Sequence, residues 1–296
     1  MPLAGVICCH GGSPQSLKHC LAMWDGGLCQ FPRHILTYLK EKEESRREVG
    51  YSVTSILGCA REQVLKKRID YSERPDLVVA RFVGDAVHRY AHDLNSGTPG
   101  YRGEERFWTE VTIKAEDGEG VVFRLSGQPD QIWAERTLID LKVTGKIPIS
   151  ANPDHVAQVN LYAWLLSDCV DADENPVSIE ITEAQITYLS PNTQRQATYH
   201  VALWSRERTE QFLQAALEPY LPWRQHGVYP EVLSPYLINH RDGHSSVDRN
   251  FRCDYCPIRQ QCDELATSER GVSPNVAAYW EGRPVQGGGP QFVEDF

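Results

Sequence analysis

Between residues 107 and 143 the sequence is a succession of short β-rich segments, and segments with helical periodicity precede and follow it. Turns that contain Gly, Asp and Glu separate the β-rich segments, which predicts a meander of strands. Beyond the meander the sequence predicts a helix, two further strands and a last helix. The expected strands are 107–113, 121–125, 131–134, 138–143, 179–189 and 197–203, and the expected helices are 76–94, 154–166 and 206–223. This order predicts an α/β fold.

The two ends of the chain differ in character from this middle part. Residues 51–70 begin with Ser and Thr capping candidates and continue with apolar residues at helical intervals, which predicts one helix with a basic second half. Residues 1–50 mix Gly-rich loops with a charged stretch of helical periodicity, and we expect a helical extension that offers a surface to a protein partner. Residues 269–296 are rich in Gly and Pro, as in a flexible tail. The main domain is therefore expected over residues 51–268.

The formal net charge of the 296-residue chain is −10, so affinity for nucleic acid requires a local basic patch. The candidate patch consists of Arg61, Lys66, Lys67 and Arg68, and it either contacts phosphates or is a solvated helix face. No stretch approaches the roughly 18–20 consecutive apolar residues that a membrane helix needs, and the first residues lack a charged region followed by a long apolar one. We expect a cytoplasmic protein without a membrane segment.

The triplet Asp140-Leu141-Lys142 is the main candidate for chemistry. Residues two apart on a strand share one face, so the Asp140 carboxylate and the Lys142 ammonium are expected side by side, with Asp130 arriving from the adjoining turn. Two carboxylates on one face bind Mg²⁺ or Mn²⁺, and the backbone carbonyl of Leu141 is a further candidate ligand. Lys142 would orient a metal-bound water or stabilise the charge of the transition state. The alternative for such a triplet is a solvated edge strand.

Two pairs of residues with helical spacing flank the triplet. Gly84 and His88 stand four residues apart on the expected helix 76–94, where His88 would add an imidazole ligand suited to Mn²⁺ and Gly84 would let another element approach closely. Gln158 and Tyr162 have the same spacing on the expected helix 154–166. They either contact a DNA phosphate or hold the lysine. The alternatives are a half-buried structural histidine and a tyrosine of a helix–sheet interface.

The C-terminal part of the chain carries Cys253, Cys256 and Cys262, a CxxC pair followed by a third cysteine. Thiolates at this spacing converge on a metal or cluster, and Cys59 is the candidate for the fourth donor. Four thiolates hold either zinc or an iron–sulfur cluster, and the spacing does not distinguish the two. The other five cysteines are expected to be free thiols: Cys8, Cys9, Cys20, Cys29 and Cys169. The four N-terminal ones interleave with histidines, so a second metal site among them is the alternative.

Four short patterns occur in order along the chain, and together they resemble the RecB-like branch of the PD-(D/E)xK nucleases. They are GxxxH at Gly84 and His88, GxxD at Gly127 and Asp130, DxK at Asp140 and Lys142, and QxxxY at Gln158 and Tyr162. The resemblance spans about Tyr51 to Leu265 and implies a restriction-endonuclease-like core, a mixed sheet flanked by helices. It implies that the matching histidine and acidic residues bind the catalytic metal, that Lys142 supports catalysis and that the QxxxY pair contacts the substrate. Glu110 resembles a glutamate common in this branch.

The arrangement of the cysteines resembles one group of nucleases within this branch. One cysteine before the nuclease motifs and three after them is similar to the 4Fe-4S nucleases, which include the CRISPR-associated RecB-like exonucleases, the AddB subunit and exonuclease V. The resemblance implies a 4Fe-4S cluster in a helical subdomain formed from both chain ends. Its ligands would be Cys59, Cys253, Cys256 and Cys262.

These features together predict a Mg²⁺- or Mn²⁺-dependent DNA exonuclease that acts on single-stranded ends. Tyr71, Trp108 and Tyr162 are candidates for stacking on unpaired bases. The rival prediction is a catalytically silent DNA-binding or scaffold module. CRISPR adaptation, recombination or repair, and phage DNA metabolism are all compatible with the sequence.

Overall fold

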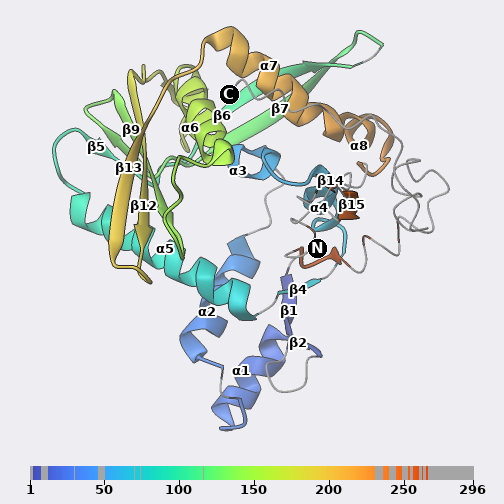
Figure 1. Ribbon diagram of the computed structural model, residues 1–296. Helices are drawn as coiled ribbons and strands as arrows, with labels where there is room; N and C mark the ends of the chain where they lie inside the picture. The colour runs from blue at the N-terminus through green and yellow to red at the C-terminus, as the bar shows by residue number, and fades with distance from the viewer. Residues whose placement is uncertain are drawn as a thin grey trace.

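The computed structural model describes residues 3–7, 13–29, 31–45, 51–69, 71–73, 75–115, 117–230, 236–239, 245–248, 253, 256–259, 262 and 265. Within this part, helix α6 (Pro153–Leu166) stands between two five-stranded sheets (Figure 1). Side chains of both sheets, of α6 and of the helices that follow them in sequence form one hydrophobic core. The molecule is therefore a mixed α/β fold, as the order of predicted elements indicates.

The first sheet contains the strand with the Asp140-Leu141-Lys142 triplet. Its strand order is β13-β12-β9-β8-β5, in which β9 pairs in parallel with β12 and antiparallel with β8. A parallel pair needs a crossover connection, and α6 lies in the crossover from β9 to β12. The strands are β5 (Tyr101–Arg102), β8 (Gln131–Trp133), β9 (Thr137–Val143), β12 (Glu183–Ser190) and β13 (Arg195–Val201).

The second sheet has the order β11-β10-β6-β7-β3. Strands β6 and β7 form a long antiparallel pair, and β3 pairs in parallel with β7. Both large sheets are thus mixed, which agrees with the expected core. The strands are β3 (Tyr51–Ser52), β6 (Phe107–Lys114), β7 (Gly120–Gly127), β10 (Cys169–Val170) and β11 (Pro176–Val177).

Helix α6 begins where the sequence predicts a helix start. The Asn152 side chain caps it by accepting a hydrogen bond from the Asp154 N–H at 2.9 Å, and Pro153 occupies the first turn. Val159, Leu161 and other side chains around the helix are buried, because sheets cover it on two sides. The long helix α5 (Pro75–Asn95) contacts β9 from outside this core.

Two expected helices are interrupted. Residues 51–69 contain two short helices, α3 (Val53–Ile56) and α4 (Ala60–Leu65), so the prediction of one helix is wrong. A reciprocal Ser52–Ser55 capping box starts α3, and Cys59 in an extended conformation starts α4. The expected helix 206–223 ends early because Pro219 lacks an N–H to donate. It becomes α7 (Arg206–Leu217), a 3₁₀ turn (Glu218–Tyr220) and α8 (Leu221–His226).

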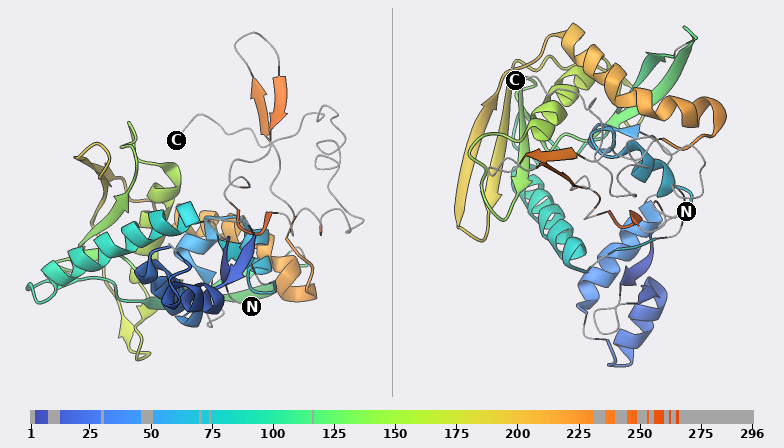
Figure 2. Two further views of the ribbon diagram at one scale, coloured as in Figure 1. Left: turned by 90° about the horizontal axis from the view of Figure 1, so that it is seen from below. Right: turned by 45° about the vertical axis from the view of Figure 1, so that its right-hand side comes forward.

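The N-terminal region is less purely helical than expected. Besides α1 (Leu17–Asp25) and α2 (Arg33–Ser45) it forms β1 (Leu3–Ile7) and β2 (Pro14–Ser16), and β1 pairs in parallel with β4 (Tyr71–Glu73). A second core cluster joins this region to α5 and to Ile258. Figure 2 shows α1 and α2, in blue, lying beyond α5 on the side away from the first sheet.

The remaining described elements are small. Strands β14 (Tyr236–Asn239) and β15 (Ser245–Asp248) form an antiparallel pair. No helix within the described ranges combines the length and the apolar character that crossing a membrane requires. The expected tail 269–296 and residues Cys8 and Cys9 lie outside the described residues.

Candidate active site

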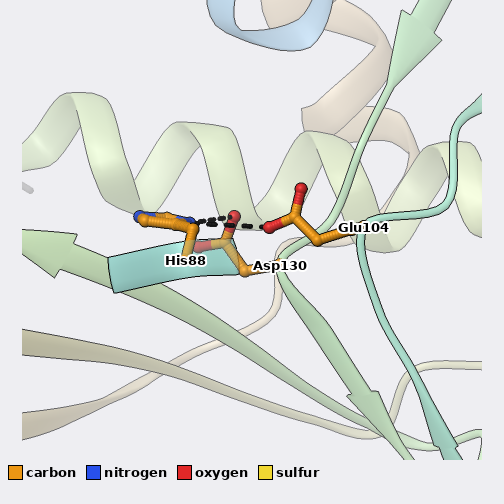
Figure 3. Close-up of side chains that lie close together, drawn as sticks. All are labelled: His88, Glu104 and Asp130. Carbon is orange, nitrogen blue, oxygen red and sulfur yellow. Dashed lines mark ion pairs between the residues drawn. The ribbon is translucent and has the colours of Figure 1, made fainter. Parts of the chain in front are cut away.

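Three potential metal ligands from separate parts of the chain meet beside α5. They are His88 on α5, Glu104 in the turn before β6 and Asp130 between β7 and β8, and their ligand atoms all lie within 4.8 Å of one another. His88 Nδ1 is 3.1 Å from Asp130 Oδ1 and 3.8 Å from Glu104 Oε1. Figure 3 shows the three side chains turned toward one another. One imidazole and two carboxylates suit Mn²⁺ or Mg²⁺.

The Asp130 carboxylate is oriented by the strand that carries the triplet. The Leu141 backbone N–H donates a hydrogen bond to Asp130 Oδ2 at 2.7 Å. The other oxygen, Oδ1, is the one near His88. A direct hydrogen bond therefore links the GxxD and DxK patterns.

Glu104 is a site residue that the sequence did not single out. Its backbone N–H donates to the Pro129 carbonyl at 3.2 Å, and its φ of 56° lies in the left-handed region that non-glycine residues seldom adopt. The Gln128 side-chain amide also donates to Glu104, so both backbone and carboxylate are fixed beside Asp130. The weak signal in the sequence is a pair of adjacent acidic residues just before a strand. Glu110, the glutamate named by resemblance, is exposed on β6 opposite Arg124 and does not line this site.

Asp140 and Lys142 face each other on β9, as their two-residue spacing predicts. Lys142 Nζ lies 3.1 Å from Asp140 Oδ1 and 2.9 Å from Oδ2. Asp140 is 1% exposed, and apart from this ion pair its Oδ2 has no hydrogen-bond partner among the described residues. A buried carboxylate oxygen in this condition is the kind of atom that a metal ion satisfies. The alternative of a solvated edge strand is wrong, because β9 is a central strand.

Burial and mutual charge shift the pKa values of these groups. Burial raises the pKa of Asp140 to about 7, and the neighbouring Lys142 opposes this shift. Burial lowers the pKa of Lys142, but the carboxylates of Asp140 and Asp130 raise it overall. Burial also acts to lower the pKa of His88, yet Asp130 and Glu104 raise it to about 10. An imidazole must be neutral to bind a metal, so metal binding at this site would release the His88 proton.

Gln158 connects the lysine to α6. Its Oε1 accepts a hydrogen bond from Lys142 Nζ at 3.0 Å, and its Nε2 donates to the Tyr162 hydroxyl at 3.1 Å and to Thr54 Oγ1 at 3.4 Å. Gln158 and Tyr162 are both buried. Of the two roles considered for this pair, the structure shows the second: Gln158 holds the lysine.

The glycines of the two glycine-containing patterns differ in their surroundings. A Cβ on Gly127 would lie 3.0 Å from the Tyr162 ring, so the absence of a side chain there lets the β7 backbone pack against α6. A Cβ on Gly84 would meet nothing within 4 Å. The expectation that Gly84 permits a close approach is therefore wrong for the described part of the chain.

One open cleft of about 590 Å³ is lined by the three potential metal ligands, by Lys142 and by the Gln158–Tyr162 pair, whereas Asp140 is buried behind its wall. Carboxylates and His88 occupy one part of its wall, and Lys142, Arg89 and Arg106 contribute positive charge. Arg106 Nη2 donates to Gln128 Oε1 at 2.7 Å, so it is attached to the residue that fixes Glu104. The cleft therefore combines a cation site with groups that attract a phosphate.

The predicted basic patch is mostly engaged in the fold. Arg61 is 2% exposed and donates to the Pro230 carbonyl at 2.9 Å, and Lys66 forms an ion pair with Glu62 at 2.5 Å. Lys67 and Arg68 lie over aromatic rings. Tyr71 and Tyr162, proposed to stack on bases, are 3% and 4% exposed. Phosphate contact by Arg61 and base stacking by these two tyrosines are therefore wrong, because the groups are buried.

The four cysteines of the predicted cluster are all half-buried, and among the described residues no three of their sulfur atoms lie within 4.8 Å of one another. Burial raises the pKa of the Cys59 thiol to about 11, and the charges of Cys262 and Cys253 contribute to the rise. Burial likewise raises the pKa of Cys256 to about 12, with a contribution from Cys59. The structure therefore does not show the predicted cluster, which stays a prediction. Cys20 and Cys169 are buried and Cys29 is half-buried.

A cleft with an imidazole, carboxylates and a lysine on a mixed-sheet fold has the groups that metal-dependent hydrolysis of a phosphate ester uses. The comparisons name the family. The sequence model of the PD-(D/E)XK nuclease superfamily matches residues 22–263, and the chain belongs to that superfamily. It is accordingly a nuclease of a superfamily that uses divalent metals.

Comparison with solved structures gives the same fold. The crystal structure of SSO0001 matches with a TM-score of 0.52 and 18% sequence identity, over 78% of this chain and 95% of that chain. At this identity the likeness concerns the fold alone. The comparison with curated proteins gave no match.

Proposed function

We propose that this protein is a metal-dependent DNA exonuclease that acts on single-stranded ends. The observation that carries the proposal is the convergence of His88, Glu104 and Asp130 on the cleft that also receives Lys142. Membership of the superfamily supports nuclease chemistry. The four ordered sequence patterns support the RecB-like branch, and an open cleft with arginines in its wall suits a flexible single strand.

The proposed ligands of Mg²⁺ or Mn²⁺ are His88, Asp130, Asp140 and the backbone carbonyl of Leu141, with Glu104 in addition. The fit rests on the 4.8 Å cluster and on the buried Oδ2 of Asp140. A hard cation prefers oxygen donors, and Mn²⁺ also accepts an imidazole. When bound, the ion supplies Lewis-acid activation of a phosphoryl oxygen and a water of lowered pKa.

Lys142 is the catalytic residue proposed from this chain. Asp140 and Gln158 hold its ammonium at 2.9 Å and 3.0 Å, so it meets the scissile phosphate in a fixed orientation. Its raised pKa keeps it protonated at neutral pH. It therefore stabilises the negative charge of the transition state and does not act as a base. Gln158 acts as a positioning residue, with Tyr162 behind it.

We further propose a 4Fe-4S cluster at Cys59, Cys253, Cys256 and Cys262. The cysteine pattern of the sequence supports this proposal, and all four side chains are half-buried. Iron rather than zinc follows from the resemblance to the 4Fe-4S nucleases. The cluster would join α4 to the C-terminal part and so stabilise the domain. Protein purified without oxygen should be brown and contain iron and sulfide, whereas a colourless protein with zinc would overturn the cluster.

A nuclease assay tests the main proposal. Labelled single-stranded DNA should be degraded from an end in the presence of Mg²⁺ or Mn²⁺ and remain intact with a chelator. Asp140→Ala and Lys142→Ala should each reduce the rate by at least about 100-fold. The matched control is Lys146→Ala, at an exposed lysine in the loop after β9. Variants that degrade DNA like the wild type would overturn the assignment.

The second candidate function is a catalytically silent DNA-binding or scaffold module. It predicts DNA binding without hydrolysis under every metal condition, and the same assay distinguishes it. The presence of His88, Asp130, Asp140 and Lys142 in one region favours the enzyme. We propose a role in DNA processing, in CRISPR adaptation, recombination and repair, or phage DNA metabolism.

A further inference from the structure

A second hollow lies next to the catalytic cleft, between α2 and α5. It is a groove of about 750 Å³, with Arg33, His34 and Glu41 of α2 on one wall and Tyr90 and other residues of α5 on the opposite wall. The two helices lie against each other (Figure 1). The His34 and Tyr38 rings both contact the Phe82 ring there, with centroids 5.5 Å and 5.3 Å apart.

The groove and the catalytic cleft share two wall residues. Asp85 and Arg89, one helical turn apart on α5, line both hollows. His88, the metal-ligand candidate, stands directly beside Arg89 in the sequence. A chain that leaves the cleft across these two residues therefore enters the groove. This shared wall favours an extended part of the substrate over an unrelated protein as the occupant.

The groove offers an unused aromatic ring. Tyr90 is 66% exposed, and it takes part in no ring contact or hydrogen bond within the described part of the chain. A free, exposed ring beside a nuclease cleft is suited to stacking on a base, and stacking accepts any base because every base has a π-face. His34 is exposed on the opposite wall and adds a second ring.

The charges of the groove indicate which interaction with a nucleic acid is stronger there, attraction of phosphates or stacking on bases. Arg89 forms no ion pair with any described residue, and Arg33 is a half-exposed cation 3.5 Å from Asp25. Three carboxylates oppose these two arginines, although one of them, Asp85, accepts a hydrogen bond from Tyr38 at 2.8 Å. With charges this balanced, phosphate attraction is modest and base stacking must dominate. The acidic groups in the wall are Glu41, Asp85 and Asp93.

We propose that the α2–α5 groove is a subsite for single-stranded nucleic acid, in which Tyr90 stacks on a base of the strand whose end or scissile phosphate occupies the catalytic cleft. The inference rests on the proposed nuclease function. From Asp85 to Asp93 the helix rises about 12 Å, a length suited to a short stretch of strand. The N-terminal helix α2 thereby becomes part of the substrate site.

The experiment measures binding of labelled single strands to the full chain in an Asp140→Asn background, which prevents cleavage. A strand of roughly 20 nucleotides should bind Tyr90→Ala roughly 5- to 100-fold more weakly, and Tyr90→Phe should restore binding. Arg33→Ala should lower the slope of log affinity against log salt by about 0.7. A dinucleotide should bind all variants equally. The matched control is Leu94→Ala, an apolar residue 65% exposed on α5 outside the groove.

The outcomes separate this inference from the proposed function. If the Asp140→Asn protein binds the long strand, and adding Tyr90→Ala or Arg33→Ala does not weaken that binding, the groove proposal is overturned. A protein partner would then be the remaining candidate occupant of the groove. Weakened binding of the dinucleotide in Tyr90→Ala would also overturn it, since the defect would then lie in the cleft. If the wild type neither binds nor cuts any single strand, the nuclease proposal itself fails, and the groove proposal fails with it.

Discussion

The side-chain amide of Gln128 donates a hydrogen bond to Glu104 Oε2 at 2.8 Å and another to the Glu104 backbone carbonyl at 3.1 Å. Gln128 lies within the GxxD pattern that also supplies Asp130. One short segment after β7 therefore provides one carboxylate of the candidate metal site and fixes the other. The two carboxylates are consequently positioned together although 26 residues separate them in sequence (104 to 130).

The first prediction concerns this pair. Glu104→Gln should lower the affinity for Mn²⁺ by about 10- to 100-fold, because a carboxylate ligand is lost. Gln128→Ala should lower it by about 10-fold, because the carboxylate becomes mobile. Calorimetry or the electron spin resonance of free Mn²⁺ measures both. Glu110→Gln is the matched control, since Glu110 is exposed on β6. Unchanged Mn²⁺ affinity in Glu104→Gln would remove Glu104 from the ligand set.

The second prediction compares two glycines. Gly127→Ala should lower the free energy of unfolding by about 1–3 kcal/mol, because its Cβ would press on the Tyr162 ring. Gly84→Ala should raise it by up to about 1 kcal/mol, because alanine favours the helix and its Cβ meets open space. Urea denaturation of each variant measures the change. Equal effects of the two substitutions would contradict the packing described.

The third prediction concerns pH and stability. The Tyr188 hydroxyl accepts a hydrogen bond from the Asn152 N–H and forms a second hydrogen bond with His155 Nδ1 at 2.8 Å. Burial, helped by the charge of Lys142, lowers the pKa of His155 from 6.5 to about 4. The unfolded chain therefore takes up this proton first as the pH falls. The stability that the group contributes is present above pH 6.5 and is lost between pH 6.5 and about 4.

Urea midpoints measured across this pH range test the assignment. His155→Asn keeps a hydrogen-bonding group near the position of Nδ1 but does not titrate, so its stability should fall less steeply with decreasing pH than that of the wild type. His200→Asn, at an exposed position of β13, is the matched control. A His155→Asn protein with the wild-type slope would show that this histidine does not carry the effect.

The fourth prediction concerns the cysteines. Cys59→Ser and Cys256→Ser should each lower the iron content and the thermal stability of protein prepared without oxygen, because a ligand that joins α4 to the C-terminal part is lost. Cys29→Ser, at a half-buried free thiol outside this group, should change neither. Iron analysis and a melting curve measure the two effects. Full iron content in the Cys59→Ser protein would exclude Cys59 as a ligand.

The sequence by itself determined the features that depend on local periodicity. The facing of Asp140 and Lys142 follows from the alternation of side chains along a strand, and the Gln158–Tyr162 pair follows from the helical repeat of α6. Most predicted strands and helices exist for the same reason, with bounds that differ by a few residues. The order of the four patterns also indicated the superfamily that the comparisons show.

Tertiary structure alone decided which distant residues meet. Glu104 joins His88 and Asp130 because the turn before β6 is hydrogen-bonded to the turn after β7, and no local pattern encodes that contact. Arg61 looks like a surface cation in the sequence, but the chain segment at Pro230 covers it. Periodicity fixes the direction of a side chain relative to its own element, whereas burial and ligand sets depend on how elements far apart in the chain pack.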